Sequence, residues 1–167
     1  MAVIRVCGCD TGSRNIGLAI IEYNTESKVL SCIDSTHFVS TGISIPEQLN
    51  SLAQYLKQYL DTHKPQIFAY EKTVFKGKAA SGVGLGVQQA TGIVRLIAYK
   101  KGCEEHNFTP QQVKLYTTGK STADKNDIFL VISALFPDTK FWASHDHATD
   151  ACGVAISYLK KEYKVEF

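Results

Sequence analysis

The order of the patterned segments constrains the fold of this chain more than any other feature. Three runs with the alternation and β-branched content of strands, at 2–10, 16–23 and 29–40, follow one another with short turns between them. Runs spaced in this way pair as an antiparallel meander. From residue 44 onward the pattern changes to helices that alternate with short apolar strands.

The clearest helix spans 44–64, where apolar residues recur at intervals of three and four. Short strands are expected at 65–71 and 103–109, with a helix from about 85 to 101 between them. Strands that are joined through a helix in one sheet are parallel, because the chain must cross back over the sheet. The order therefore predicts an α/β fold with a mixed five-stranded sheet and helices on both faces.

The C-terminal third is expected to be helical. Residues 110–125 predict a helical turn followed by a polar loop, and Asp124 is expected to open a helix that Pro137 ends. A last helix is expected to begin in the segment SHDHATDACGVAI, with Ser144 as its N-cap. No repeat or linker interrupts the pattern, so a single domain over 1–167 is predicted.

Composition argues against a membrane span and against a disulfide framework. No segment approaches the roughly 18 consecutive apolar residues of a transmembrane helix, and the N-terminus lacks the features of a signal peptide, so a cytoplasmic location is expected. The five cysteines are an odd number in mostly apolar segments, which is typical of reduced thiols. Cys7 and Cys9 lack the second pair of a zinc site, and strand alternation would place both on one face.

Charge is distributed unevenly along the chain. Residues 72–125 hold nine Lys and Arg against three Asp and Glu, so this segment carries +6 and the remainder carries −4. A basic middle beside an acidic remainder indicates a polyanionic partner next to a carboxylate site, although exposed lysines are also common on ordinary solvated surfaces.

Two acidic residues stand where apolar strands end. Asp10 ends the first predicted strand and Glu71 ends the fourth. Ligands of such sheets bind in the crevice beyond the strand ends, so neighbouring strands would bring the two carboxylates together. Each acid also has a purely local explanation, since Asp10 could cap the turn at Gly12 and Glu71 could be an edge charge.

The last helix could close the third side of this site. His147 and Asp150 are three residues apart and share a helix face, whereas Asp146 points to another side and is expected to support a ligand or to cap the helix. An acidic first turn that favours the helix dipole would explain the same residues. Grouped carboxylates and an imidazole suit Mg²⁺ or Mn²⁺ better than zinc, and two such ions about 4 Å apart support phosphodiester hydrolysis.

These motifs, in this order, resemble those of RuvC-type Holliday junction resolvases, a branch of the ribonuclease H-like nucleases. The segments that carry the resemblance extend over nearly the whole chain: CDTGSR at 9–14, AYE at 69–71, PQQVK at 110–114 with Gly119 and ADK at 123–125, and HATDA at 147–151. The resemblance implies a ribonuclease H-like fold and a homodimer that nicks a four-way DNA junction symmetrically. It points to no particular branch-migration partner.

The resemblance also implies roles for individual residues. Four side chains would hold Mg²⁺ or Mn²⁺, with two ions expected in each active site: Asp10, Glu71, His147 and Asp150. Lys114 and Lys125 would contact phosphates near the scissile bond, and Lys125 is expected to assist catalysis. Further DNA contacts are expected from the first-strand motif and from the basic, glycine-rich loop: Arg14, Phe75, Lys76 and Lys78.

Two positions depart from the family pattern. His147 replaces the first terminal acid, as in some other members, so we expect activity with an altered metal preference. An aromatic wedge residue usually comes three residues after the second acid, but Val74 occupies that place here and Phe75 follows it.

Two other functions are weighed against the nuclease. One is a junction-binding module, catalytically weak because His147 has disabled metal binding. The other follows from Asp10, Thr11 and Gly12, followed by Gly17, which also resemble the phosphate loop of sugar kinases and actin-like ATPases. Those proteins close two related domains around ATP, and this chain has room for only one. A junction-cleavage assay with Mg²⁺ and with Mn²⁺ separates the three.

Overall fold

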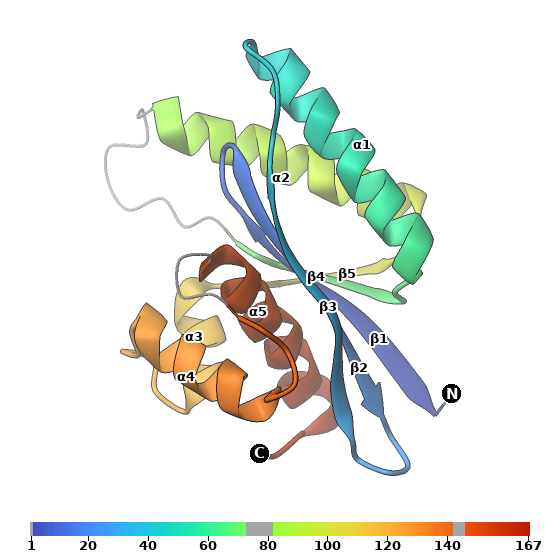
Figure 1. Ribbon diagram of the computed structural model, residues 1–167, viewed down its shortest axis with the longest axis vertical. Coiled ribbons are helices and arrows are strands. Elements are labelled where there is room, and N and C mark those ends of the chain that lie inside the picture. The colour runs from blue at the N-terminus through green and yellow to red at the C-terminus, as the bar shows by residue number, and fades with distance from the viewer. Residues whose placement is uncertain (1, 73–81, 142–145) are drawn as a thin grey trace.

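The computed structural model describes residues 2–72, 82–141 and 146–167 and contains one mixed sheet (Figure 1). The first three strands form the predicted antiparallel meander, and the last two lie parallel to the first. Their order in the sheet is β3-β2-β1-β4-β5. Their bounds are β1 Val3–Thr11, β2 Asn15–Asn24, β3 Leu30–Val39, β4 Ile67–Glu71 and β5 Glu104–Phe108. The predicted α/β fold with five strands and helices on both faces is confirmed.

Helices cover both faces of the sheet (Figure 1). Two lie on one face and three on the other, and each layer has its own apolar core. The first layer contains α1 Ile45–His63 and α2 Gly82–Lys100, and the second contains α3 Pro110–Thr118, α4 Lys125–Leu135 and α5 Asp146–Tyr163. None of the described helices combines the length and the apolar character that crossing a bilayer requires.

Local sequence determines where several helices begin. Capping boxes start α1, α3 and α4, at Ser44, Thr109 and Asp124 respectively, and each satisfies backbone N–H groups that a helix leaves unpaired. The prediction of a single helical turn here was too short, because α3 extends for nine residues from the N-cap Thr109 to the left-handed C-cap Gly119. Helix α2 begins at Gly82, earlier than residue 85, so its glycines did not prevent helix formation.

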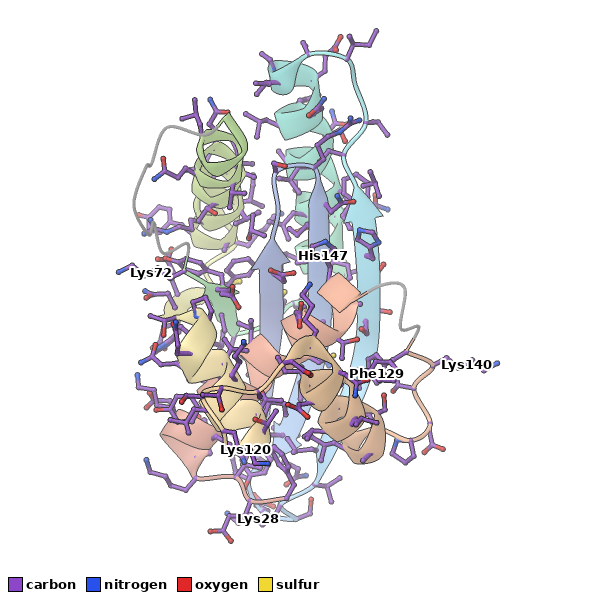
Figure 2. All side chains as sticks on the ribbon, turned by 90° about the vertical axis from the view of Figure 1, so that its left-hand side faces the viewer. Lys28, Lys72, Lys120, Phe129, Lys140 and His147 are labelled. Atoms are coloured by element: carbon purple, nitrogen blue, oxygen red, sulfur yellow. The ribbon has the colours of Figure 1, made fainter. Side chains whose placement is uncertain are left out.

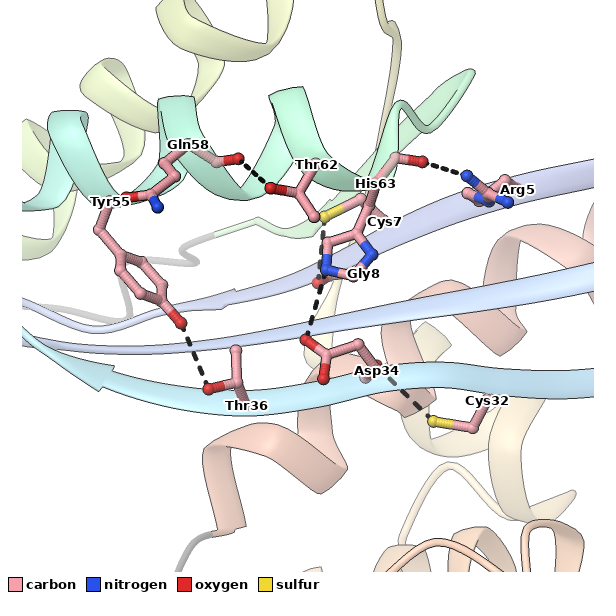
Figure 3. A network of polar contacts seen from close by, with 10 residues as sticks. All are labelled: Arg5, Cys7, Gly8, Cys32, Asp34, Thr36, Tyr55, Gln58, Thr62 and His63. Atoms are coloured by element: carbon pink, nitrogen blue, oxygen red, sulfur yellow. Dashed lines mark hydrogen bonds and ion pairs between the residues drawn. The ribbon is translucent and has the colours of Figure 1, made fainter.

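Polar contacts join α1 to the sheet on the first face (Figure 3). The Tyr55 hydroxyl lies 3.3 Å from Thr36 Oγ1 on β3, and His63 Nε2 lies 3.6 Å from Asp34 Oδ2. Arg5 on β1 donates a hydrogen bond to the backbone carbonyl of His63. These contacts hold the C-terminal half of α1 over β1 and β3.

Strand alternation divides β1 between the two cores. The side chains of Cys7 and Cys9 are fully buried on the α1–α2 face, as the alternation predicted, and all five cysteines are free thiols. Glycine takes the place of a side chain on the opposite face, where a Cβ on Gly8 would come 2.0 Å from the carbonyl oxygen of Ala151 in α5. Helix α5 therefore packs directly on the backbone of the sheet.

Candidate active site

A row of residues crosses the sheet at the carboxyl end of β1. Asp10 pairs with Gly17 on β2, and Gly17 pairs with His37 on β3. On the other side, Cys9 pairs with Tyr70 in the parallel β1–β4 ladder, so Asp10 and Glu71 are the next residues along these two strands. Residues paired across adjacent strands point to the same face of a sheet. The structure thus brings Asp10 and Glu71 to one face, at neighbouring strand ends.

The first turn of α5 lies over this row, because the backbone of His147 stands directly above Gly17. Figure 2 shows His147 at the start of α5. His147 Nδ1 is 2.5 Å from Asp10 Oδ2, and the side chains of His147 and Asp10 are 29% and 17% exposed. The helix can come so close because Gly17 has no side chain: a Cβ there would lie 1.8 Å from the carbonyl oxygen of His147.

Helix α4 adds a positive charge to the same site. Lys125 is the first residue of α4, after the N-cap Asp124. Its Nζ lies 3.6 Å from Asp150 Oδ2, one turn of α5 after His147. The Asp150 side chain is 16% exposed and that of Lys125 is 65% exposed, so the ammonium group remains accessible beside a half-buried carboxylate.

The pKa of Glu71 shows how closely these charges are grouped. The pKa of its carboxyl group is raised from 4.5 to about 7, mainly by burial, then by the negative charge of Asp10 and then by that of Asp150. The positive charges of Lys125 and Lys114 act in the opposite direction. Glu71 therefore lies within electrostatic range of four residues that the sequence places in the site.

The donor set suits a hard divalent cation. Three carboxylates and one imidazole offer mostly oxygen ligands, which Mg²⁺ and Mn²⁺ prefer. In the part of the chain that the structure describes, no three acidic, histidine or cysteine side chains are arranged as a metal site, and His147 Nδ1 and Asp10 Oδ2 turn toward each other instead. A cation would relieve the repulsion that contributes to the raised pKa of Glu71.

The other residues predicted to contact DNA lie at different distances from this site. Lys114 lies half-buried on α3, close enough to influence Glu71. Arg14 is exposed in the β1–β2 turn and, with Ser13, lines a cavity of about 250 Å³ that α1 and α2 also border. Phe75, Lys76 and Lys78 lie outside the described residues.

The structure adds two residues to this neighbourhood that the sequence analysis did not single out. The His37 ring lies against that of His147, with 5.3 Å between centroids and 31° between planes. His37 Nε2 is 3.1 Å from Asn15 Oδ1. The sequence signal that could have found His37 was its place near the end of a predicted strand, but only the β2–β3 register aligns it with Asp10.

The sequence of this chain is similar to known proteins over most of its length. Residues 6–158 match the family described as "Crossover junction endodeoxyribonuclease RuvC". The protein of that name from Mycobacterium ulcerans is 33% identical over 158 residues, which cover 93% of this chain and 83% of the relative. That from Mycolicibacterium vanbaalenii is 28% identical over 155 residues, covering 93% and 78%.

Solved structures share the fold at lower identity. Thermus thermophilus RuvC superposes with a TM-score of 0.80 at 19% identity, covering 97% of this chain and 98% of that one. A complex of T. thermophilus RuvC with a Holliday junction substrate also gives 0.80, at 20% identity and 92% coverage of both chains. The yeast mitochondrial Holliday junction resolvase gives 0.71 at 13% identity, covering 97% and 82%.

Proposed function

Because the chain belongs to the RuvC family of crossover junction endodeoxyribonucleases, we propose that it cleaves DNA at the row that contains Asp10 and Glu71. The enzyme is a Holliday junction resolvase, so the reaction is phosphodiester hydrolysis on a four-way junction. The observation that supports the proposed site is the environment of Glu71, whose pKa is influenced by two further carboxylates and by two lysines.

We propose that Asp10, Glu71, His147 and Asp150 hold divalent cations, two in each site. Members of the family generally depend on Mg²⁺, and this donor set also suits Mn²⁺. When bound, such ions activate water and stabilise the leaving oxygen of a phosphodiester. His147 and Asp10, which contact each other in this structure, would both turn donor atoms toward such an ion.

The lysines are proposed to orient the DNA. Lys125 extends from the N-terminus of α4, and its exposed ammonium group lies near Asp150. Lys114 reaches the same region from α3. Both can contact phosphate oxygens next to the carboxylates and so offset the repulsion between the DNA backbone and an acidic site. The ion pair with Asp150 keeps Lys125 beside the reacting groups before DNA binds.

We also propose that the enzyme is a homodimer, since paired symmetric nicks need two active sites. Helix α2 offers a surface for this contact: Leu85, Leu96 and Tyr99 are 57%, 47% and 79% exposed. With Gly92 they recur at helical intervals and so lie along one stripe. A Cβ on Gly92 would meet nothing within 4 Å, so this stripe leaves room for a second helix to approach closely.

The proposal is tested with purified protein and a labelled four-way junction. Cleavage should require Mg²⁺ or Mn²⁺, and Asp10→Asn should abolish it while junction binding persists, because the change removes a ligand charge without altering the lysines. The matched control is Asp34→Asn, which lies on β3 against His63 on the opposite face of the sheet and should cleave like the wild type.

The outcomes separate the candidate functions. Symmetric nicks that Asp10→Asn abolishes support the nuclease site. Junction binding by the wild type without cleavage in either metal would instead favour the binding module. Cleavage by Asp10→Asn at the wild-type rate would mean that the row across the sheet is not the catalytic site.

A further inference from the structure

The row of paired residues extends one strand beyond the proposed ligands. His37 on β3 pairs with Gly17, which pairs with Asp10 on β1. Because the intervening residue has no side chain, the space above it is filled by the backbone of α5 at His147. His37 and Asp10 thus flank the first turn of α5 on its two sides.

His37 is itself held in place. Its Nε2 is 3.1 Å from Asn15 Oδ1, at the start of β2. The neighbouring part of β3 is also tied to the helix, since the Ser35 hydroxyl donates a hydrogen bond of 3.5 Å to the carbonyl oxygen of Ala148. Strand β3 therefore contacts the first turn of α5 through the Ser35 hydroxyl and the His37 ring.

The ring contact is the one that reaches the proposed ligand. The His37 and His147 centroids are 5.3 Å apart with planes inclined by 31°, so the two imidazoles are tilted neighbours. A ring at this distance limits the rotation of the neighbouring imidazole about χ2, which has broad preferences when nothing constrains it. The orientation that results points His147 Nδ1 at Asp10 Oδ2.

We propose that His37, anchored by Asn15, is a positioning residue that fixes the plane of the His147 imidazole and thereby selects Nδ1 as the atom facing Asp10. Groups that orient a metal-binding histidine typically contribute about tenfold to a hundredfold to metal affinity. The consequence for metal binding rests on the proposed function, whereas the orientation of the ring is a property of the metal-free protein and can be measured separately.

The test uses the full chain and two spectroscopic measurements. Nitrogen-15 NMR of the imidazoles reports the environment of the His147 nitrogens without metal, and pulsed EPR of bound Mn²⁺ reports nitrogen coupling from a histidine ligand. In His37→Ala we expect changed His147 nitrogen shifts, Mn²⁺ binding weakened about tenfold and a reduced nitrogen coupling. His37→Phe keeps a ring against His147 but loses the contact to Asn15, so it should restore only part of the affinity.

A double-mutant cycle examines the anchoring residue. Asn15→Ala should weaken Mn²⁺ binding in the wild-type background but add little to His37→Ala, because both act through the same ring. The control is His106→Ala. His106 lies on β5 and forms a hydrogen bond with Glu104, so the variant protein should bind Mn²⁺ like the wild type. Thermal unfolding identifies any variant that loses its fold; if His37→Ala does, His37→Phe and Asn15→Ala carry the test.

The positioning role is overturned if His37→Ala keeps the wild-type His147 shifts and the wild-type Mn²⁺ affinity, or if the effects of Asn15→Ala and His37→Ala simply add. Either result would leave the nuclease proposal standing. Conversely, a wild-type protein that cleaves no junction would refute the proposed function, while the NMR comparison would still decide whether His37 orients His147.

Discussion

At the scale of single residues, Glu71 is held where its charge is unfavourable. The pKa of its carboxyl group in the folded protein is about 7, above the ordinary value of 4.5. Folding is therefore favoured by this group at low pH, and that contribution is lost as pH rises from about 4.5 through about 7. A pKa difference of this size corresponds to about 3 kcal/mol.

Glu71→Gln should accordingly stabilise the metal-free protein at high pH. We expect a gain of up to about 3 kcal/mol in the free energy of unfolding at about pH 8 and little gain at about pH 4.5, because glutamine carries no charge to bury. Urea unfolding at both pH values, with a chelator present, measures the difference. Equal changes at the two pH values would show that Glu71 does not titrate as described.

His147 is the residue at which metal preference should be adjustable. A neutral imidazole can bind a metal and an imidazolium cannot, so wild-type cleavage should fall at acidic pH. His147→Asp should stay active, shift its preference from Mn²⁺ toward Mg²⁺ and lose part of that acid-side decrease. Cleavage rates of the two proteins, measured across pH under each metal, should differ; identical profiles would remove His147 from the ligands.

Part of this site could be predicted from the sequence, because some of its residues occupy recognisable positions at strand ends or at helical spacing. Asp10 and Glu71 follow apolar strands, and His147 and Asp150 have helical spacing, so their convergence can be expected from the sequence alone. His37 and Asn15 follow no such rule. Their positions depend on the register of β2 against β3, which includes a shift between Ile20 and Ile21 that no local pattern revealed.

At the scale of elements, a substitution on the exposed stripe of α2 tests the proposed dimer. Leu96→Glu places a charge in the middle of the exposed stripe, where a close helix contact would bury it without a partner. We expect the dimer dissociation constant to rise at least about tenfold, which corresponds to about 1.4 kcal/mol. Analytical ultracentrifugation measures the constant, and circular dichroism checks that the helix content is unchanged.

The control for this change lies on the opposite layer. Leu130 on α4 is 56% exposed, and Leu130→Glu should leave the association unchanged. A wild-type protein that sediments as a monomer at micromolar concentration, or a Leu96→Glu variant that dimerises normally, would exclude α2 as the interface.

Elements were predicted where hydrophobic spacing and capping agree. Helix α1 combines a capping box at Ser44 with buried Leu52, Leu56 and Leu60, and its expected bounds differ by only one residue at each end. Helix α2 was harder to place, because glycines at 82, 84 and 86 disfavour helix while Ala90, Val94 and Ala98 pack it onto the sheet. Packing against the sheet therefore determines where α2 begins, and helix propensity alone does not predict that position.

At the scale of the whole molecule, the distance between α5 and the sheet depends on glycine. Gly8→Ala would place a Cβ 2.0 Å from the carbonyl oxygen of Ala151, and backbone cannot move aside as a flexible side chain can. We expect destabilisation of about 1–3 kcal/mol or more, measured by urea unfolding. Gly86→Ala is the comparison: its Cβ would meet the Ser13 Cβ at 3.1 Å, and helix propensity offsets part of that contact. Similar stability changes in both variants would contradict this account.

Gly17 has a related consequence for how other sequences are interpreted. A chain could carry all four proposed ligands and still lack a working site if a bulky residue stood at the position of Gly17, because the first turn of the last helix would be displaced from the strand ends. Scanning genomes for the acidic residues alone would then count inactive proteins as resolvases. A search that also requires glycine at positions 8 and 17, under the last helix, would separate chains able to assemble the site from those that only retain its ligand residues.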